Sequence, residues 1–148
     1  MKLSLSVEIF DSLQDLMRLF RSRMRQSLET VHPELTFNEA RILLRTGLQP
    51  GVTQKDLVEH SRIDKAQMAR ILAHLQEKGW LQRSPSATDK RVRCLSLSAA
   101  GTQLFTQLRA LQEQIATELL QGCAQETQAE LHALLLQTRD SANQAAEA

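Results

Sequence analysis

Residues 53–101 read TQKDLVEHSRIDKAQMARILAHLQEKGWLQRSPSATDKRVRCLSLSAAG, and this stretch decides the fold. It begins with two short segments of helical composition, TQKDLVEHS and DKAQMARILAHLQEKG, separated by only a few residues. Apolar side chains recur in the second segment at i, i+3, i+4 and i+7: Met68, Ile71, Leu72 and Leu75. Asp64 is placed to cap this helix, with Gln67 at the return position of a capping box, and Gly79 ends it. The pattern predicts two short helices joined by a tight turn.

A β-hairpin is predicted directly after the second helix. The segments WLQRS and RVRCLSLS are short enough to be two strands, and they flank the turn ATDK at residues 87–90. This turn and its edge carry one anion and three cations: Asp89, Lys90, Arg91 and Arg93. A turn needs one or two turn-forming residues and has no need of three cations, so their presence indicates a function. Ser98 is predicted to begin a long C-terminal helix.

The remaining segments predict further helices. Thr36 and Glu39 have the spacing of a capping box, which predicts a helix that runs to about Leu48. Thr53 is expected to begin another helix, with Asp56 in its first turn where the helix dipole favours an anion. The predicted order is four helices, a hairpin and two helices, a mainly α fold with one small β-hairpin.

Long amphipathic helices are predicted at both ends of the chain. In residues 7–29 one apolar side chain recurs every three or four positions: Phe10, Leu13, Met17, Phe20 and Met24. A similar stripe near the C-terminus consists of Leu104, Leu108, Leu111, Ile115 and Leu119, then Leu131, Leu134 and Leu135. These stripes favour packing against a second subunit, with an intramolecular helical bundle as the alternative.

Charge is distributed unevenly along the chain. The formal net charge is +1, but residues 53–93 hold nine cations and five anions, or +4, whereas residues 94–148 hold two cations and six anions, or −4. A basic middle segment favours a polyanionic partner, and ordinary solvated surface charge is the alternative. Aromatic residues make up only 3% of the chain, which argues against carbohydrate-binding platforms and base-stacking surfaces.

The two short helices match a helix-turn-helix, and the second has the composition of a groove-reading helix. Rotation by about 100° per residue places small and cationic side chains away from its apolar stripe: Ala66, Ala69, Arg70 and Ala73, with Lys65 and Gln67 beside them in the first turn. Alanines allow a close approach to a groove wall, Gln67 can pair with adenine, and Arg70 and Lys65 can reach guanine or phosphate. Alanines also simply form helices well on a solvated face, which is the alternative.

The cationic hairpin favours DNA binding over that alternative. A loop that follows a recognition helix lies beside the major groove, and its tip can enter the flanking minor groove, where arginine binds well. Asp89 is expected to hold the guanidinium of Arg91 bidentately, and Lys90 and Arg93 remain available for phosphates. A surface salt bridge that only restrains a turn contributes under about 1 kcal/mol and does not require the extra cations.

The stretch 53–101 resembles the winged-helix core of the multiple-antibiotic-resistance regulator (MarR) family. The likeness is carried by LAHLQEKGWLQR, by Asp-Lys-Arg at residues 89–91, and by LSLSAAG at the start of the next helix. The first helix, the HPELT segment and the two C-terminal helices extend the likeness over nearly the whole chain. Where the family usually has threonine this chain has Ser98, which keeps the cap.

The resemblance implies a homodimeric transcriptional regulator whose terminal helices interleave and whose wings grip double-stranded DNA. It divides the chain into a winged helix-turn-helix domain at 35–98 and a dimerisation region at 1–34 and 99–148. The recognition helix, 64–78, would lie in the major groove and the wing, 84–92, in the minor groove of a pseudo-palindromic operator. The predicted DNA-binding residues are Thr53, Gln54, Lys65, Ala66, Gln67, Ala69, Arg70, Asp89, Lys90, Arg91 and Arg93. The family often has Ser or Thr where this chain has Ala66, Gln67 and Ala69, so the resemblance does not give the operator sequence.

Control by a small-molecule effector is expected, since a dimer whose geometry spaces two reading helices can be switched by whatever biases that spacing. His32, in the linker where relatives hold ligands, is the one residue suggested as an effector contact. Repression is the expected outcome. Redox switching through Cys94, which has cationic neighbours at Arg91 and Arg93, is an alternative. A protein-interaction module without an operator of its own is another.

Other classes of function have little support in the sequence. His60, His74 and His132 do not have metal-ligand spacing, Cys123 and Cys94 form no CxxC pair, and no metal or cofactor site is predicted. Residues 7–29 lack the cysteine with which some relatives sense hydroperoxides. No Ser-His-Asp or Cys-His pairing, phosphate-binding glycine loop or paired carboxylates indicates an enzyme. With no apolar run near 18 residues and no signal peptide, a soluble cytoplasmic protein is expected.

Overall fold

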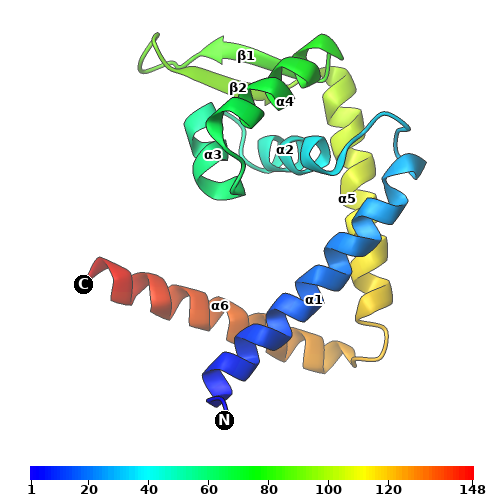
Figure 1. Cartoon of the computed structure of the whole chain (residues 1–148), viewed down its shortest axis with the longest axis vertical. Coiled ribbons are helices and arrows are strands. Elements are labelled where there is room, and N and C mark those ends of the chain that lie inside the picture. Colours follow the sequence, from blue (N-terminus) through cyan, green and yellow to red (C-terminus); the bar gives the residue numbers. More distant parts are fainter. The chain divides into compact units, whose positions relative to one another are not determined.

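The computed structural model describes all 148 residues, which form six α-helices, one short 3-10 helix and a two-stranded sheet (Figure 1). In chain order these are α1 (Leu5–Ser27), η1 (Leu28–Thr30), α2 (Phe37–Leu48), α3 (Gln54–Ser61), α4 (Lys65–Glu77), β1 (Leu81–Pro85), β2 (Arg93–Leu97), α5 (Ala99–Leu119) and α6 (Gln125–Glu147). The predicted order and the mainly α fold class with a hairpin wing are confirmed. The sequence did not indicate η1; β1 lies one residue later than its predicted segment, WLQRS, and β2 is shorter than RVRCLSLS.

Side-chain caps begin the helices of the central segment. Thr36 and Glu39 form a complete capping box at α2, as predicted. Thr53 and Asp56 form a second box at α3. The box predicted at α4 is incomplete: Asp64 accepts the N–H of Gln67 at 2.8 Å, but no return bond closes it.

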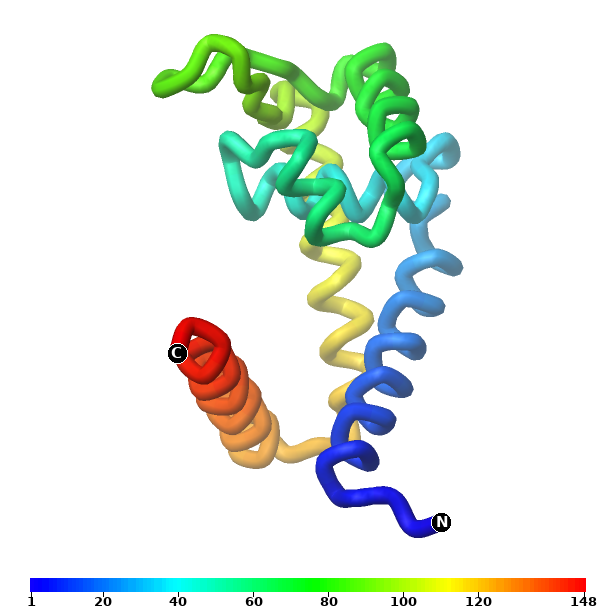
Figure 2. The backbone as a smooth tube through the Cα atoms, turned by 60° about the vertical axis from the view of Figure 1, so that its left-hand side comes forward, coloured from blue at the N-terminus to red at the C-terminus, as the bar shows by residue number.

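The end of α4 and the start of the hairpin are fixed by a Schellman motif. Gly79 takes a positive φ of 76°, its N–H donates to the carbonyl of Gln76, and the N–H of Trp80 donates to the carbonyl of Leu75. The chain then enters β1, which pairs antiparallel with β2 from Leu81↔Leu97 to Pro85↔Arg93. Figure 2 shows the connecting loop extended away from helices α2, α3 and α4.

The first turn of α5 packs directly against the end of α4. Ser98 caps the helix, as predicted: its hydroxyl accepts the Gly101 N–H at 3.0 Å and donates to the carbonyl of Gly79 at 2.5 Å, while its own N–H donates to the carbonyl of Trp80. A Cβ on Gly101 would overlap the Trp80 carbonyl oxygen, so only glycine allows this approach. The sequence LSLSAAG therefore ties α5 to the helix-turn-helix.

The hydrophobic core of the helix-turn-helix is formed by residues from five elements. The fully buried apolar side chains among them are Ile42, Leu43, Leu57, Met68, Leu72, Leu75, Leu95 and Leu108. They come from α2, α3, α4, β2 and α5. The apolar stripe predicted on α4 is thus buried, except that Ile71 is only half-buried.

The chain divides into two compact units, Met1–Glu113 and Gln114–Ala148. In the first, most apolar residues of α1 are exposed, including Phe10 at 62% and Met17 at 48%. In the second, no residue of α6 is buried, and Leu134 is 59% exposed. The stripe of α1 and the α6 part of the C-terminal stripe therefore present apolar surface, whereas the α5 part is buried: Leu104, Leu108, Leu111 and Ile115. No helix combines the length and the hydropathy needed to cross a membrane.

Candidate nucleic-acid interface

The exposed face of α4 lies opposite the face that enters the core. Met68, Leu72 and Leu75 are completely buried. The side chains that the sequence placed on the outer face are exposed: Lys65, Ala66, Ala69, Arg70 and Ala73. Gln67 is half-buried at the edge of this face. Three alanines and two cations make a surface that a groove wall can approach closely and that favours phosphate.

The turn between α3 and α4 contains the only non-glycine residue with positive φ. Arg62 adopts φ 60° and ψ 16°, a left-handed conformation that is strained for a residue with a Cβ. Arg41 of α2 supports this turn, because its guanidinium donates a hydrogen bond to the carbonyl of Ser61 at 2.8 Å. Burial lowers the pKa of Arg41, and the nearby Arg21 and Arg25 lower it further. The turn thus exposes Arg62, and a second arginine, Arg41, supports its backbone.

The start of α3 is joined to the hairpin, which explains how its residues are positioned. Thr53 forms a β-bridge with Cys94, and its hydroxyl is occupied by the cap of α3. Hydrogen bonds from the N–H and hydroxyl of Thr53 lower the pKa of Asp56. Gln54 accepts from Arg83 of β1 at 3.5 Å. Thr53 and Gln54 therefore sit at the contact between α3 and the sheet.

The loop of the hairpin carries the wing cations. Asp89 Oδ1 accepts both the backbone N–H of Arg91 at 3.0 Å and its Nε at 3.3 Å. The expected bidentate pairing of the two side chains is therefore wrong: one carboxylate oxygen receives one guanidinium nitrogen, and the second bond comes from the backbone. The Arg91 side chain is 93% exposed, so most of its donors face solvent. Lys90 and Arg93 are also exposed.

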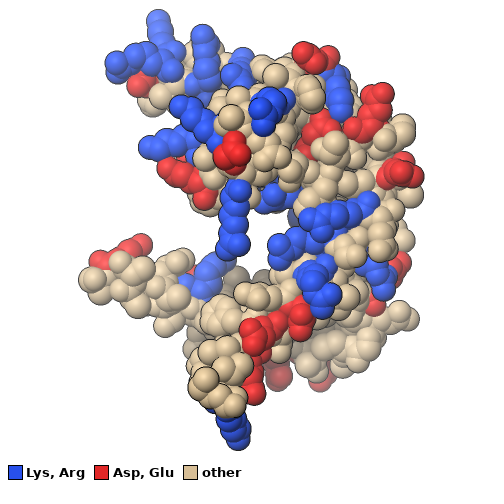
Figure 3. Space-filling view, in the orientation of Figure 1, with Lys and Arg blue, Asp and Glu red and all other residues tan.

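Basic side chains gather at the end of the molecule that carries the hairpin (Figure 3). Two of its exposed cations were not among the residues singled out from the sequence. They are Arg62 in the helix-turn-helix turn and Arg83 on β1. Their only sequence signal was net charge, because neither position belongs to a motif. The tertiary structure brings them to the same part of the fold as α4 and the wing.

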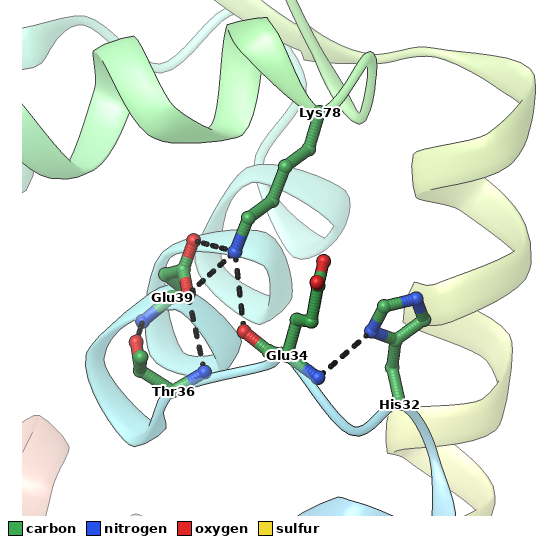
Figure 4. A network of polar contacts seen from close by, with 5 residues as sticks. All are labelled: His32, Glu34, Thr36, Glu39 and Lys78. Carbon is green, nitrogen blue, oxygen red and sulfur yellow. Dashed lines mark hydrogen bonds and ion pairs between the residues drawn. The ribbon is translucent and has the colours of Figure 1, made fainter.

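An ion pair with a buried carboxylate ties the end of α4 to the first turn of α2 (Figure 4). Lys78 Nζ lies 3.2 and 3.0 Å from the two carboxylate oxygens of Glu39, whose side chain is 4% exposed, and it also donates to the carbonyl of Glu34 at 3.1 Å. The same ammonium lies 5.1 Å from the ring centroid of Trp80. No local sequence pattern indicates this connection, because its partners are far apart in the chain.

His32 belongs to the same network. Its Nδ1 accepts the Glu34 N–H at 3.1 Å, and its ring meets Trp80 edge-on with centroids 5.0 Å apart. These contacts give His32 a packing role in the linker. The effector contact suggested for it stays a prediction.

The other histidines and the cysteines are dispersed. His60 bonds the Asp56 carbonyl, His74 lies on α4, and His132 is exposed on α6. Cys94 and Cys123 are free and half-buried, and they lie in different units. No group of three or more His, Cys, Asp or Glu residues could hold a metal ion.

The comparisons with known proteins agree with a winged helix-turn-helix made of α2, α3, α4 and the hairpin. The model of the MarR family matches residues 34–92, from the linker to the tip of the wing. The transcriptional regulator HosA of Escherichia coli O157:H7 is 26% identical over 126 residues, which cover 85% of this chain and 90% of HosA. Over residues 34–92 the chain therefore matches the MarR family, and over most of its length it is similar to a transcriptional regulator.

Solved structures of this family share the fold. A crystal structure of MarR superposes with a TM-score of 0.77 at 19% identity and covers 98% of this chain and 97% of that one. A MarR-family regulator from Listeria monocytogenes, solved with a 26mer DNA, gives a TM-score of 0.73 at 19% identity and covers 95% and 89%. This chain thus has the winged-helix fold of these MarR-family structures.

Proposed function

We propose that this protein is a homodimeric, sequence-specific repressor that binds a pseudo-palindromic operator and is released by a small-molecule effector. In each subunit the recognition helix, 64–78, enters a major groove and the wing, 84–92, enters the flanking minor groove. The two half-sites are about one helical turn apart, ~10 bp. Residues 35–98 bind DNA, and residues 1–34 and 99–148 form the dimer.

The observation that carries the proposal is that two cationic elements lie on one fold. The exposed face of α4 holds Lys65 and Arg70 among alanines, and the wing holds Arg91 with a restrained backbone and a solvent-facing guanidinium. A helix of this composition fits a major groove, and an arginine at a loop tip fits a narrow minor groove. The Listeria relative solved with DNA supports the same assignment by family likeness.

The predicted DNA contacts have distinct roles in this proposal. Gln67, at the edge of the exposed face, reads a base, and Ala66 and Ala69 allow the close approach. Arg70 and Lys65 contact guanine or phosphate. The start of α3 at Thr53 and Gln54 contacts the DNA backbone, and the Gln54 main-chain N–H is the donor, since the N–H and the hydroxyl of Thr53 are both bonded to Asp56 in the capping box.

The unburied helices at the two ends support dimer formation. Exposed apolar stripes on α1 and α6 are too extensive for an isolated soluble protomer, because such patches normally mark an interface. A homodimer with two-fold symmetry would also match a pseudo-palindromic site. Sedimentation equilibrium of the full chain gives the oligomeric state directly.

The test of DNA binding begins with selection of bound fragments from a random DNA library, followed by affinity measurements at several salt concentrations. Replacement of Arg91 by Ala should weaken binding to all sequences alike. It should also reduce the slope of log affinity against log salt by about two, roughly one phosphate contact per subunit. Arg139→Ala is the matched control, because Arg139 also pairs with a neighbouring aspartate but lies on α6. Equal slopes for the two variants would remove the wing from the interface.

Base reading is tested separately. Gln67→Ala should change the preferred sequence more than the overall affinity, and an unchanged preference would show that Gln67 reads no base.

The two alternative functions, a thiol switch and an interaction module, predict different outcomes. A thiol switch requires that peroxide releases the wild type and leaves Cys94→Ser bound, whereas an interaction module would bind no DNA even at low salt.

A further inference from the structure

The turn between α3 and α4 determines where the recognition helix begins. It consists of three residues, 62–64, and its middle residue, Ile63, is buried in the core. Within the turn the N–H of Ile63 donates to the hydroxyl of Ser61 at 3.2 Å, and Asp64 caps α4. Because so short a turn has little conformational freedom, the position of the last residue of α3 determines the position of the first turn of α4.

One side chain ties this turn to another element of the domain. Arg41 of α2 donates from Nη2 to the carbonyl of Ser61 at 2.8 Å and from Nη1 to Oδ1 of Asn38 at 3.2 Å. The other hydrogen bonds of residues 61–64 stay within α3, the turn and α4. Arg41 therefore supplies the hydrogen bond that holds the turn to α2.

The carbonyl of Ser61 is well suited to a guanidinium. Ser61 is the last residue of α3, so its carbonyl has no partner within the helix and lies at the negative end of the helix dipole. The guanidinium of Arg41 is planar and its donors are fixed relative to one another, so the bond to Asn38 orients the bond to Ser61. A lysine at this position could make one of these bonds but not both.

Arg41 keeps its charge in surroundings that oppose it. Burial lowers the pKa of Arg41, and the cations Arg21 and Arg25 on α1 lower it further. The hydrogen bonds to Ser61 and Asn38, together with the dipole of α3, offset these two costs. The side chain is therefore part of the packed domain and is not a free cation on its surface.

We propose that Arg41 is a positioning residue for DNA reading: through the Ser61 carbonyl it holds α4 in the pose that reads bases, and it does not itself contact DNA. This inference rests on the proposed function, since it names a residue on which base reading depends from behind the DNA-binding face. Arg41 is half-buried on α2, whereas the proposed base and groove contacts lie on α4 and the wing.

The two kinds of DNA contact differ in how far they reach, which makes the role of Arg41 measurable. A base contact by Gln67 needs a hydrogen bond within about 2.7–3.2 Å, so a displacement of α4 by about 1 Å breaks it. Attraction to phosphates extends over about 10 Å at 0.1 M salt, so the same displacement changes it little. Loss of Arg41 should therefore weaken binding to the operator and spare binding to unrelated DNA.

The experiment measures the affinity of Arg41→Gln for the operator selected above and for unrelated DNA of the same length, at several salt concentrations. The ratio of the two affinities should fall at least about tenfold, the effect of about one mismatched base pair. The salt slope on unrelated DNA should equal that of the wild type, because no phosphate contact is lost. Arg41→Lys should keep part of the ratio, since it retains one of the two bonds.

Arg45→Gln is the matched control, because it makes the same change of charge at an exposed position one turn later in α2 and should keep the ratio. Equal ratios in Arg41→Gln and Arg45→Gln would overturn the proposal. A parallel loss of both affinities with a smaller salt slope would identify Arg41 as a phosphate contact and would overturn it too. Should Arg41→Gln not fold, Arg41→Lys is compared with Arg45→Lys, and equal ratios again decide against positioning.

The hold on the turn is also tested without DNA, by amide hydrogen exchange of the full-length protein. Amides of residues 61–68 should exchange at least about fivefold faster in Arg41→Gln than in the wild type, and at the wild-type rate in Arg45→Gln. Equal exchange in the two variants would show that Arg41 does not hold the turn. If the wild type binds no DNA at all, the proposed function fails, while the exchange rates still decide whether Arg41 positions α4.

Discussion

Loss of the ammonium at Lys78 should destabilise the fold more than loss of any surface lysine. Lys78→Met keeps the length of the side chain and leaves Glu39 with its side chain 4% exposed and without its counter-ion. Removal of one partner from a fully buried pair costs about 3–5 kcal/mol. Since the Lys78 side chain is 27% exposed and the Thr36 N–H still donates to Glu39, we expect a smaller loss, about 2–3 kcal/mol.

This loss corresponds to a decrease in melting temperature of about 5–10 °C for a chain of this length. The assay is urea and thermal unfolding at one fixed protein concentration, because a dimer's stability depends on concentration. Lys55→Met is the matched control: Lys55 is 84% exposed and lies 3.9 Å from Glu59, so it should change stability by less than about 0.5 kcal/mol.

A double-mutant cycle separates the ion pair from side-chain packing. Glu39→Gln removes the charge that Lys78→Met leaves unpaired, so the double variant should be more stable than the sum of the two losses by about 1–3 kcal/mol. Strict additivity, or a Lys78→Met loss no larger than that of Lys55→Met, would refute the conclusion that this ion pair holds the end of α4 to α2.

Three further predictions concern the backbone and the caps. Gly101→Ala should destabilise by about 1–3 kcal/mol and shift the fluorescence of Trp80, because its Cβ would overlap the Trp80 carbonyl; an unchanged spectrum and melting curve would contradict the packing of α5. Arg62→Gly should stabilise by about 1 kcal/mol in urea unfolding by relief of the positive φ, whereas Arg62→Ala, which keeps a Cβ, should not; equal effects would exclude strain as the cause. The pKa of Asp56 is lowered from 3.8, chiefly by the Thr53 N–H, so its stabilising effect is present above that value and lost as pH falls below it. The urea midpoints of the wild type and Asp56→Asn should therefore differ at neutral pH and converge below about pH 4, and a constant difference would contradict the role of the charge.

Much of the secondary structure could be predicted because its signals are local. The stripe of Met68, Leu72 and Leu75 fixes which face of α4 is buried, and the caps at Thr36 and Thr53 fix where two helices begin. Such signals act within one or two turns of helix and need no distant partner. The same logic was less reliable for Gln67, whose return bond to Asp64 is not formed.

The functional residues also divide into those with a local sequence signal and those without one. The cations of the wing were evident because they cluster in a turn, and the outer face of α4 followed from helical rotation. Arg62 and Arg83 gave no such signal, and neither did the hydrogen bond that joins Arg41 to Ser61. Positions that belong to no motif become significant only when separate helices bring them together.

The amino-acid sequence by itself determined the helices, the hairpin, the exposed face of α4 and the charge of the wing. Periodicity, capping and turn preference each depend on residues that lie within a short segment of the chain. Only the tertiary structure decided that Lys78 forms an ion pair with Glu39 and that Gly101 lies against the Trp80 carbonyl. The two contacts join residues that are 39 and 21 positions apart, and their geometry depends on how the core packs rather than on any local preference.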